Sequence, residues 1–294
     1  MADTMFRSPI AIICSVNRPE VLHETVLCLT RQTVPCSILI SVPAEADVLP
    51  ATRQLPGVEV LLGARGASAQ RNRALRSISG TPELIAFLDD DMEVEEHYIE
   101  ELQRTYREHA STVLVNGANL AHGIYPAGTL NREIARKLIQ DQLKRGLPEE
   151  NLIPARTGYG SRMSFRGSLL GKVEFDERLP LYSYMEDYDF TLECRIYGSV
   201  GENPRALGVH IELSSGRVAE SKRGYSEIVN PVYIWSKRTG AALPRTLGGA
   251  LKRTLKNAAK SPNSYFRKRL FGNLLGWSHL LVGKIEPEYI LKMK

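Results

Sequence analysis

Three adjacent aspartates, Asp89, Asp90 and Asp91, follow a run of apolar residues that ends at Leu88. Neighbouring carboxylates repel one another, so keeping all three ionised costs free energy unless a cation lies among them. Carboxylate oxygens are hard ligands that suit Mg²⁺ or Mn²⁺, above all when diphosphate oxygens complete the coordination. The alternative is a solvated loop that caps the following helix, but a cap requires one aspartate rather than three. The cluster therefore predicts a divalent cation site.

A second acidic cluster contains Glu186, Asp187 and Asp189 and opens a segment with the spacing of a helix. A carboxylate near a helix N-terminus stays ionised and is able to take a proton from an attacking hydroxyl. An acidic pair at a helix start is also a common structural feature. Together, the two clusters supply a cation site and a separate base, which are the minimal equipment for activated group transfer.

The elements that position these clusters have the pattern of an α/β protein. Short apolar runs of strand length alternate with segments of helical spacing; the runs are Ile10–Val16, Ser37–Val42, Val58–Leu62 and Leu84–Leu88. This alternation predicts a mostly parallel sheet with helices on both faces, and ligands bind such sheets at the carboxyl ends of the strands. Polar clusters lie at three such ends, at Ser15–Glu20, Gly66–Arg73 and Asp89–Asp91. A further helix is expected over Asn131–Arg145.

The charge of the chain is unevenly distributed. The 294 residues contain 38 Lys and Arg against 33 Asp and Glu, a net charge of +5. Residues Ala241–Lys294 contribute eleven basic and two acidic residues, or +9, which leaves −4 for the rest. A mildly acidic body with a basic tail is not typical of a nucleic-acid-binding domain, so no nucleic acid is expected as a partner.

The four cysteines and the N-terminus favour a cytoplasmic protein. Cys14, Cys28, Cys36 and Cys194 show no CxxC spacing, so neither a zinc site nor a disulfide framework is indicated. The apolar run after the N-terminus is too short for a signal peptide, and no apolar segment reaches the length of a transmembrane helix.

Six short motifs, in their order along residues 8 to 240, resemble family 2 glycosyltransferases, which are inverting enzymes of GT-A fold. The motifs are Ser15-Val-Asn-Arg-Pro19 with Leu29-Thr-Arg-Gln-Thr33, Ala69-Gln-Arg-Asn-Arg-Ala74, Leu88-Asp-Asp-Asp91, Ser164-Phe-Arg166, Phe175-Asp-Glu-Arg-Leu179 and Glu186-Asp-Tyr-Asp189. The resemblance implies a Rossmann-like GT-A catalytic domain over residues 1–240, followed by a basic helical extension over 241–294.

The resemblance also implies the reaction and the residues that perform it. A nucleoside diphosphate sugar, with a UDP-sugar favoured, would donate its glycosyl group to a hydroxyl of a glycan or lipid-linked acceptor in the presence of Mn²⁺ or Mg²⁺. Asp91 would bind the metal, with His210 as a further ligand, and Asp187 would act as the base while Glu186 helps to hold the acceptor. The donor-binding residues would be Ser15, Asn17, Glu20, Arg71, Asp89 and Asp90.

Four positions leave alternatives open. His210 follows a strand-like run and is either a metal ligand or a structural histidine. The family's usual base-reading aspartate after the second strand is absent, so either Glu45 or Asp47 replaces it or base recognition differs. Arg162 stands where many relatives carry Asn, and would contact donor phosphate or an anionic acceptor. Arg217 and the pair Lys222-Arg223 are expected in a loop, either over the diphosphate or in solvent.

Three other functions compete with this interpretation. A haloacid-dehalogenase-type phosphatase expects a DxDx(T/V) motif near the N-terminus, whereas Glu93 stands four positions after Asp89. A sugar nucleotidyltransferase expects a glycine-rich loop, which Ser15-Val-Asn-Arg-Pro19 is not. A GT-A-like module that binds a nucleotide or glycan without turnover is the third alternative.

The basic tail has the pattern of two amphipathic helices. Leu247, Leu251 and Leu255 share one face of Thr246–Lys260, and apolar residues from Phe266 to Leu281 recur at helical spacing after Pro262. Basic helices of this kind lie on anionic membrane surfaces. The tail therefore predicts a cytoplasmic enzyme that is peripheral on the cytosolic face of a membrane. Together with the family resemblance, it implies a role in cell-envelope or exopolysaccharide synthesis. The alternative is that both helices pack on the catalytic body.

Overall fold

The computed structural model describes residues 8–121, 129–181, 184–213, 219–238 and 243–293. These residues form two compact units, each described here by itself. The sheet unit consists of Met1–Arg65, Gln70–Phe175 and Phe190–Gly216, and the helical unit consists of Gly66–Ala69, Asp176–Asp189 and Arg217–Lys294. The predicted domain boundary at residue 240 stays a prediction. In the structure, Asp176–Asp189 and the residues from Arg217 onward belong to the same unit as the C-terminal helices.

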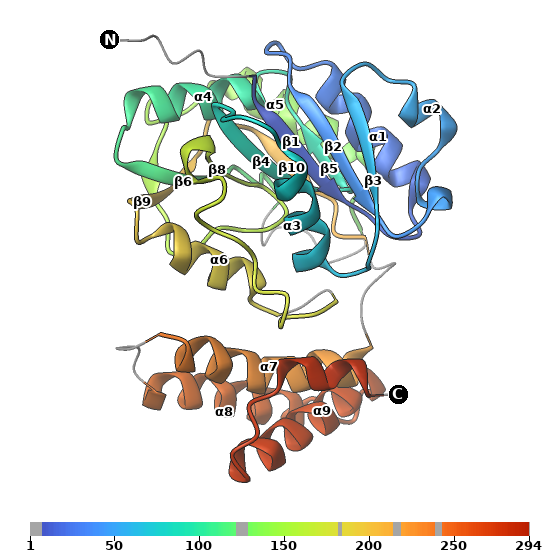
Figure 1. The fold of residues 1–294 in the computed structure, drawn as a ribbon, viewed down its shortest axis with the longest axis vertical. Coiled ribbons are helices and arrows are strands. Elements are labelled where there is room, and N and C mark those ends of the chain that lie inside the picture. Colours follow the sequence, from blue (N-terminus) through green and yellow to red (C-terminus); the bar gives the residue numbers. More distant parts are fainter. Residues whose placement is uncertain (1–7, 122–128, 182–183, 214–218, 239–242, 294) are drawn as a thin grey trace. The chain divides into compact units, whose positions relative to one another are not determined.

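An eight-stranded sheet in the order β3-β2-β1-β4-β8-β6-β9-β7 forms the centre of the sheet unit (Figure 1). Its strands are β1 Ile10–Cys14, β2 Ser37–Val42, β3 Val58–Leu62, β4 Leu84–Asp89, β6 Thr112–Gly117, β7 Ile153–Pro154, β8 Met163–Arg166 and β9 Ser199–Asn203. β3, β2, β1 and β4 are parallel, β6 and β9 are parallel, and β8 pairs antiparallel with both β4 and β6. The predicted α/β class with a mostly parallel sheet is confirmed.

Strands β1, β2 and β4 are largely buried on both faces, as their continuous apolar runs predicted, whereas β3 is only partly buried. Alternate residues of β1 enter different cores: Ala11 and Ile13 pack in one, whereas Ile12 packs in the other. The first core also contains residues of α1 (Pro19–Thr30) and α4 (Tyr98–Glu108), and the second contains residues of α3 (Ala67–Ser77) and α6 (Glu186–Cys194). Because successive side chains of a strand point to opposite faces, this alternation places one helical layer on each side of the sheet.

A small antiparallel ribbon lies beside the main sheet. It consists of β5 (Met92–Val94) and β10 (Gly208–His210), with His210 opposite Met92. β5 begins directly after Asp91, so this pairing brings the end of β10 to the three aspartates. The remaining elements of the unit are η1 Glu45–Asp47, α2 Pro50–Arg53, α5 Arg132–Arg145 and η2 Gly167–Leu169. The helix predicted over Asn131–Arg145 is α5, and Asn131 caps it by accepting the Ile134 N–H at 2.9 Å.

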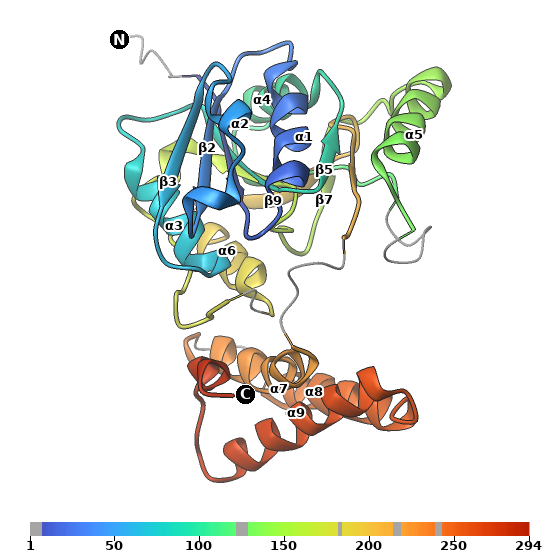
Figure 2. The same ribbon diagram turned by 90° about the vertical axis from the view of Figure 1, so that its right-hand side faces the viewer.

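The helical unit contains α7 (Glu220–Ser236), α8 (Leu243–Ala259), α9 (Ser264–Leu281) and the short η3 (Pro287–Leu291). Both helices predicted for the tail, α8 and α9, are present, and they lie side by side with α7 (Figure 2). Glycines allow the close approach of α7 and α9: a Cβ built on Gly272 would lie 1.9 Å from the carbonyl oxygen of Ser221. Among the described residues, no helix is long and apolar enough to cross a membrane.

Candidate active site

The carboxyl ends of β1 and β4 place two predicted clusters at one edge of the sheet. In the parallel pairing of these strands, Cys14 lies opposite Asp89. The loop that begins at Ser15 and the aspartates that begin at Asp89 therefore leave the sheet side by side. This is the position at which α/β sheets bind ligands.

Asp89, Asp91 and His210 form a candidate metal site. One ligand atom from each residue lies within 4.8 Å of the others. His210 Nε2 is 3.0 Å from Asp91 Oδ1 and 3.4 Å from Asp89 Oδ2. The β5–β10 ribbon makes this grouping, because Ile211 N–H donates to the Asp91 carbonyl at 3.1 Å and Leu213 N–H donates to Asp91 Oδ2 at 2.9 Å. Two carboxylates and an imidazole are a donor set that fits Mn²⁺ or Mg²⁺.

The pKa values at this site show that it favours positive charge. Burial opposes the charged form of His210, but its hydrogen bond to Asp91 and the charges of Asp89 and Asp91 raise its pKa to about 9. Burial would by itself raise the pKa of Asp91, yet the hydrogen bond and charge of His210 and the Leu213 N–H hold that pKa below its ordinary value. Such mutual stabilisation is expected where acidic groups surround a position for a cation.

Asp90 does not belong to the candidate metal site of Asp89, Asp91 and His210. Its side chain is fully buried, accepts a hydrogen bond from the Ser15 hydroxyl and lies 2.8 Å from Arg18 Nη2. Burial raises the pKa of Asp90 to about 7, although Arg18 and Ser15 act in the opposite direction. These contacts indicate that Asp90 and Ser15 hold the β1 loop against the β4 turn. Donor binding by these two residues stays a prediction that their burial does not favour.

Arg18 also lies at this edge, although the motif in which it stands predicted no role for it. It lies in the motif Ser15–Pro19 and reaches two of the three aspartates, Asp90 at 2.8 Å and Asp91 at 3.6 Å. The signal was a single arginine in a loop at the same sheet edge as three aspartates. Only the pairing of β1 with β4 makes that proximity evident.

The other residues predicted in the β1 loop are exposed. Asn17 has a left-handed backbone with φ 57°, and its N–H donates to Asp47 Oδ1 at 2.6 Å. Asp47 is buried and also accepts the Ala44 N–H at 3.0 Å, so its carboxylate connects the β1 and β2 loops. Glu20 is exposed in the first turn of α1. Glu45 pairs with Arg53 on the surface, and neither it nor Asp47 is assigned to the nucleobase by these contacts.

Arg71 and Arg162 are both buried. Arg71 lies 3.8 Å from Asp89 Oδ1, with its guanidinium 5.0 Å from the centre of the Phe175 ring. Arg71 therefore lies beside the candidate metal site, and its contact with the donor stays a prediction. Arg162 Nη1 instead pairs with Glu202 at 2.9 Å and donates to the Gly117 carbonyl. The expected contact of Arg162 with phosphate or acceptor is not supported, because these buried partners already occupy it.

The second acidic cluster begins helix α6 in the helical unit. Glu186 is buried, Asp187 is half-buried, and Asp187 Oδ1 accepts the Tyr188 N–H at 2.8 Å. Asp189 is buried and lies 2.7 Å from Lys237 Nζ. Asp189 is therefore held by a cation, and the predicted roles of Glu186 and Asp187 toward the acceptor stay predictions.

Comparisons with known proteins identify this architecture. Residues 10–148 match the model of a family described as glycosyl transferase family 2. This match covers just under half of the chain, whose sequence there is similar to that of family 2 glycosyltransferases. Among solved structures, a mannosyltransferase from Pyrobaculum calidifontis in complex with GDP-Man and Mn²⁺ aligns with TM-score 0.58 and 14% identity, covering 98% of this chain and 79% of that one. No curated protein matches the chain in sequence.

Two structures of S. aureus TarS have the same fold. TarS 1-349 in complex with UDP-GlcNAc aligns with TM-score 0.54 and 13% identity, covering 94% of this chain and 92% of that one. A longer TarS chain aligns with TM-score 0.53 and 14% identity over 81% of this chain and 41% of its own length. These neighbours show that the chain has a GT-A-like fold. The family match includes the three aspartates and ends before Asp187 and His210.

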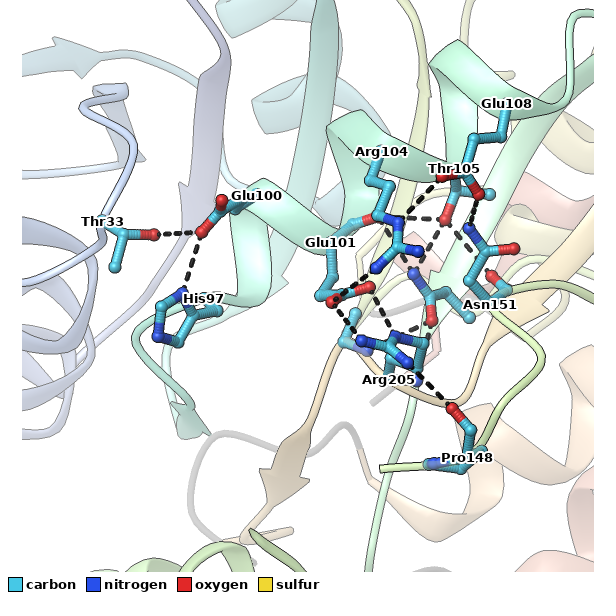
Figure 3. A network of polar contacts seen from close by, with 12 residues as sticks. Thr33, His97, Glu100, Glu101, Arg104, Thr105, Glu108, Pro148, Asn151 and Arg205 are labelled. Carbon is cyan, nitrogen blue, oxygen red and sulfur yellow. Dashed lines mark hydrogen bonds and ion pairs between the residues drawn. The ribbon is translucent and has the colours of Figure 1, made fainter. Parts of the chain in front are cut away.

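A polar groove of this glycosyltransferase lies outside the site. It has a volume of about 480 Å³ and is lined by charged residues of α4 together with Leu143, Leu147 and Arg205. Figure 3 shows the polar contacts around it: Arg205 contacts Glu101 at 3.1 Å, and Arg104 contacts Glu108 at 2.8 Å. Because these acidic and basic side chains pair with one another, the groove has no excess of positive or negative charge that would attract a charged ligand.

The expected loop after β10 is partly a helix. Lys222 and Arg223 lie in the first turn of α7, so the loop prediction is wrong for them, and Arg223 Nε lies 3.6 Å from Glu227 on the same helix. Arg223 and Glu227 have the i,i+4 spacing of a helix, but the Gly and Ser residues before them led to the prediction of a loop. Arg217 lies outside the described residues.

Proposed function

We propose that this enzyme is a metal-dependent inverting glycosyltransferase that moves a sugar from a nucleoside diphosphate sugar, with a UDP-sugar favoured, to a hydroxyl. The grouping of Asp89, Asp91 and His210 at the end of β4 carries the proposal. The complexes of neighbours with GDP-Man and Mn²⁺ and with UDP-GlcNAc support a nucleotide-sugar donor. The same observations weigh against a phosphatase or a nucleotidyltransferase.

The candidate metal site of Asp89, Asp91 and His210 is proposed to stabilise the leaving group, which is the nucleoside diphosphate. Asp91 and His210, with Asp89, would hold Mn²⁺ or Mg²⁺, which as a Lewis acid offsets the charge that develops on the departing diphosphate. Leu213 N–H and the β5–β10 ribbon fix the orientation of Asp91. Arg71 lies beside Asp89 and adds a positive charge at the donor side. Asn17 and Glu20 are the exposed residues of the β1 loop and are proposed to contact the nucleotide.

Asp187 is proposed as the base, with Glu186 holding the acceptor. Asp187 takes the proton of the acceptor hydroxyl, whose oxygen forms the new bond to the anomeric carbon. The bond from that carbon to the diphosphate oxygen breaks on the opposite side, so the configuration inverts. An ionised carboxylate in the first turn of a helix is suited to this step, because the helix dipole stabilises its charged form.

A donor-hydrolysis assay tests this function without a known acceptor. Purified protein is incubated with GDP-mannose or UDP-N-acetylglucosamine and Mn²⁺, and release of the nucleoside diphosphate is measured. We expect slow hydrolysis of at least one donor. Asp187→Asn should bind that donor normally but hydrolyse it about 10² to 10⁴ times more slowly, the range for a general base. Unchanged hydrolysis would remove Asp187 from this role, and donor binding without any turnover by the wild type would favour the non-catalytic module.

We also propose that the enzyme works at the cytosolic face of an anionic membrane, on a lipid-linked or cell-envelope glycan. Hydrogen bonds from Asn257 to Glu227 and Asn273 fix the sides of α8 and α9 that face α7. Other sides of these helices carry exposed apolar residues, namely Leu251, Leu255, Phe271, Leu274 and Leu281, each at least 52% exposed. We call these five residues the apolar face.

Basic side chains adjoin the apolar face. Lys252 and Lys256 are exposed on α8, and Arg267 and Lys268 are exposed on α9. The Trp277 Nε1–H group on α9 donates a hydrogen bond to Thr254 Oγ1 on α8 at 2.9 Å, which connects the two helices. A face that combines large exposed apolar residues with neighbouring cations complements an anionic lipid surface, where apolar burial and electrostatic attraction act together.

A further inference from the structure

The segment from Asp176 to Asp189 carries both residues proposed to handle the acceptor, and among its described residues (176–181 and 184–189) the only helix is α6, which begins at Glu186. Two non-glycine residues in it, Leu181 and Met185, have left-handed backbones with φ 62° and 73°. Such conformations cost free energy and persist only where surrounding contacts impose them. Met185 directly precedes Glu186, so something must hold this segment in place.

Helix α7 supplies a cation that binds both ends of the segment. Lys237, the residue that ends α7, places its Nζ 2.6 Å from Asp176 Oδ2 and 2.7 Å from Asp189 Oδ2. Asp189 is 1% exposed and Asp176 opens the segment. One ammonium group thus connects two carboxylates that are thirteen positions apart in the chain, and it closes the loop that contains Glu186 and Asp187.

Side chains of α7 and of Arg238, which follows it, bind the same segment. Tyr233 Oη donates to Asp176 Oδ2 at 2.7 Å, and Arg238 Nη2 donates to the Asp189 carbonyl at 3.2 Å. Asn230 is fully buried and donates from Nδ2 to the Tyr184 carbonyl at 2.9 Å, just before the strained Met185. Burial would raise the pKa of Asp176, but hydrogen bonds from Lys237, Tyr233 and the Arg178 N–H hold that pKa below its ordinary value. The contacts are therefore those of an ionised carboxylate.

We propose that Lys237 is a positioning residue for the glycosyl transfer reaction, which acts by fixing the first turn of α6 and hence the carboxylate of Asp187. This inference rests on the proposed role of Asp187. Lys237 Nζ contacts Asp176 and Asp189, and not the carboxylate of Asp187 that is proposed to react. Displacement of a catalytic group by about 1 Å costs on the order of 100-fold in rate, so a contact at Asp189, two residues after Asp187, is close enough to matter.

A double-mutant cycle between Lys237 and Asp187 tests the proposal. The measured quantity is the rate of hydrolysis of GDP-mannose or UDP-N-acetylglucosamine. We expect Lys237→Met to lower kcat about 100-fold while the KM for the donor changes less than about twofold. In the Asp187→Asn background the same substitution should cost less than about twofold, because the group that it positions is already gone. Lys237→Arg, which keeps a cation, should restore most of the activity. Lys144→Met, at a side chain that is 77% exposed on α5, is the matched control.

Two results would overturn the proposal: an equal loss in both backgrounds, which indicates a general structural role, or no loss with Lys237→Met. If Lys237→Met does not fold, Tyr233→Phe removes one contact to Asp176 and enters the same cycle, with the same two results decisive. Full hydrolysis by Asp187→Asn alone would overturn the proposed base and this inference together. A large loss with Asp187→Asn and none with Lys237→Met overturns this inference alone.

Discussion

The two acidic clusters of this glycosyltransferase are built in a similar way but are held by different parts of the chain. Each contains a buried aspartate that is bound by a basic side chain: Asp90 by Arg18 at 2.8 Å, and Asp189 by Lys237 at 2.7 Å. Charge repulsion within a cluster makes such an anchor necessary, because a buried carboxylate without a partner is costly.

The difference between the clusters is where the anchor comes from. Arg18 belongs to the loop after β1, a neighbouring strand within the matched family region. Lys237 ends α7, a helix of the helical unit that lies outside the matched region and that packs on α9. The anchor of the first cluster therefore belongs to the sheet unit, whereas the anchor of the second belongs to the helical unit.

Removing the metal ligand should give the largest effect. Asp91→Asn is expected to lower donor hydrolysis at least about 10³-fold, because the loss of Lewis-acid stabilisation of the leaving group is worth several kcal/mol. Chelation with EDTA should produce a similar loss that added Mn²⁺ reverses, measured by release of nucleoside diphosphate. Asp141→Asn on α5 is the control. Full activity in EDTA would show that the cluster does not work through a metal.

Breaking the anchor of the first cluster should act on stability. Arg18→Met leaves the buried Asp90 carboxylate without its cation, and we expect the free energy of unfolding in urea to fall by about 3 kcal/mol. Adding Asp90→Asn should recover much of this loss, since no charge is then buried. Arg145→Met, at an exposed residue in the last turn of α5, should change stability by less than about 0.5 kcal/mol. Equal effects of Arg18→Met and Arg145→Met would contradict the anchor role.

The exposed apolar residues of the two units provide a sharper contrast. Phe271→Ser with Leu274→Ser should weaken co-sedimentation with phosphatidylglycerol-containing vesicles about tenfold or more, given about 1.5 kcal/mol or more for each large apolar side chain buried. Ile196→Ser in the sheet unit, at a residue that is 70% exposed, should leave vesicle binding unchanged. Binding should also weaken as salt screens the basic residues. Loss of a dimer with no vesicle binding by the wild type would assign the face to self-association instead.

The smallest expected effect concerns the second anchor and its pH dependence. Since the folded-state pKa of Asp176 lies below its ordinary value of 3.8, its ionised form stabilises the fold above that value, and this contribution is lost as the pH falls through the folded-state pKa. Asp176→Asn should therefore lower Tm by about 2–4 °C at pH 7, and the difference should shrink below pH 3.8. A constant difference across this range would contradict the ion pair with Lys237.

Much of the sheet was predictable because its strands are continuous apolar runs. β2 and β3 begin and end where those runs do, and the predicted run before Asp89 is β4. Lys222 and Arg223 were misplaced because the Gly and Ser residues before them resemble a loop. The environment of Arg162 was not predictable at all, since its partner Glu202 lies forty positions later on β9.

The sequence alone determined the residue types of the site, since three adjacent aspartates after a buried strand repel one another whatever the fold around them. It also determined the basic helical character of the tail, because spacing and charge are local properties. Only the tertiary structure decided which carboxylates serve as anchors. Arg18 meets Asp90 through strand pairing, and Lys237 meets Asp189 across 48 positions of sequence. Contacts at such separations depend on chain topology, and no local pattern encodes them.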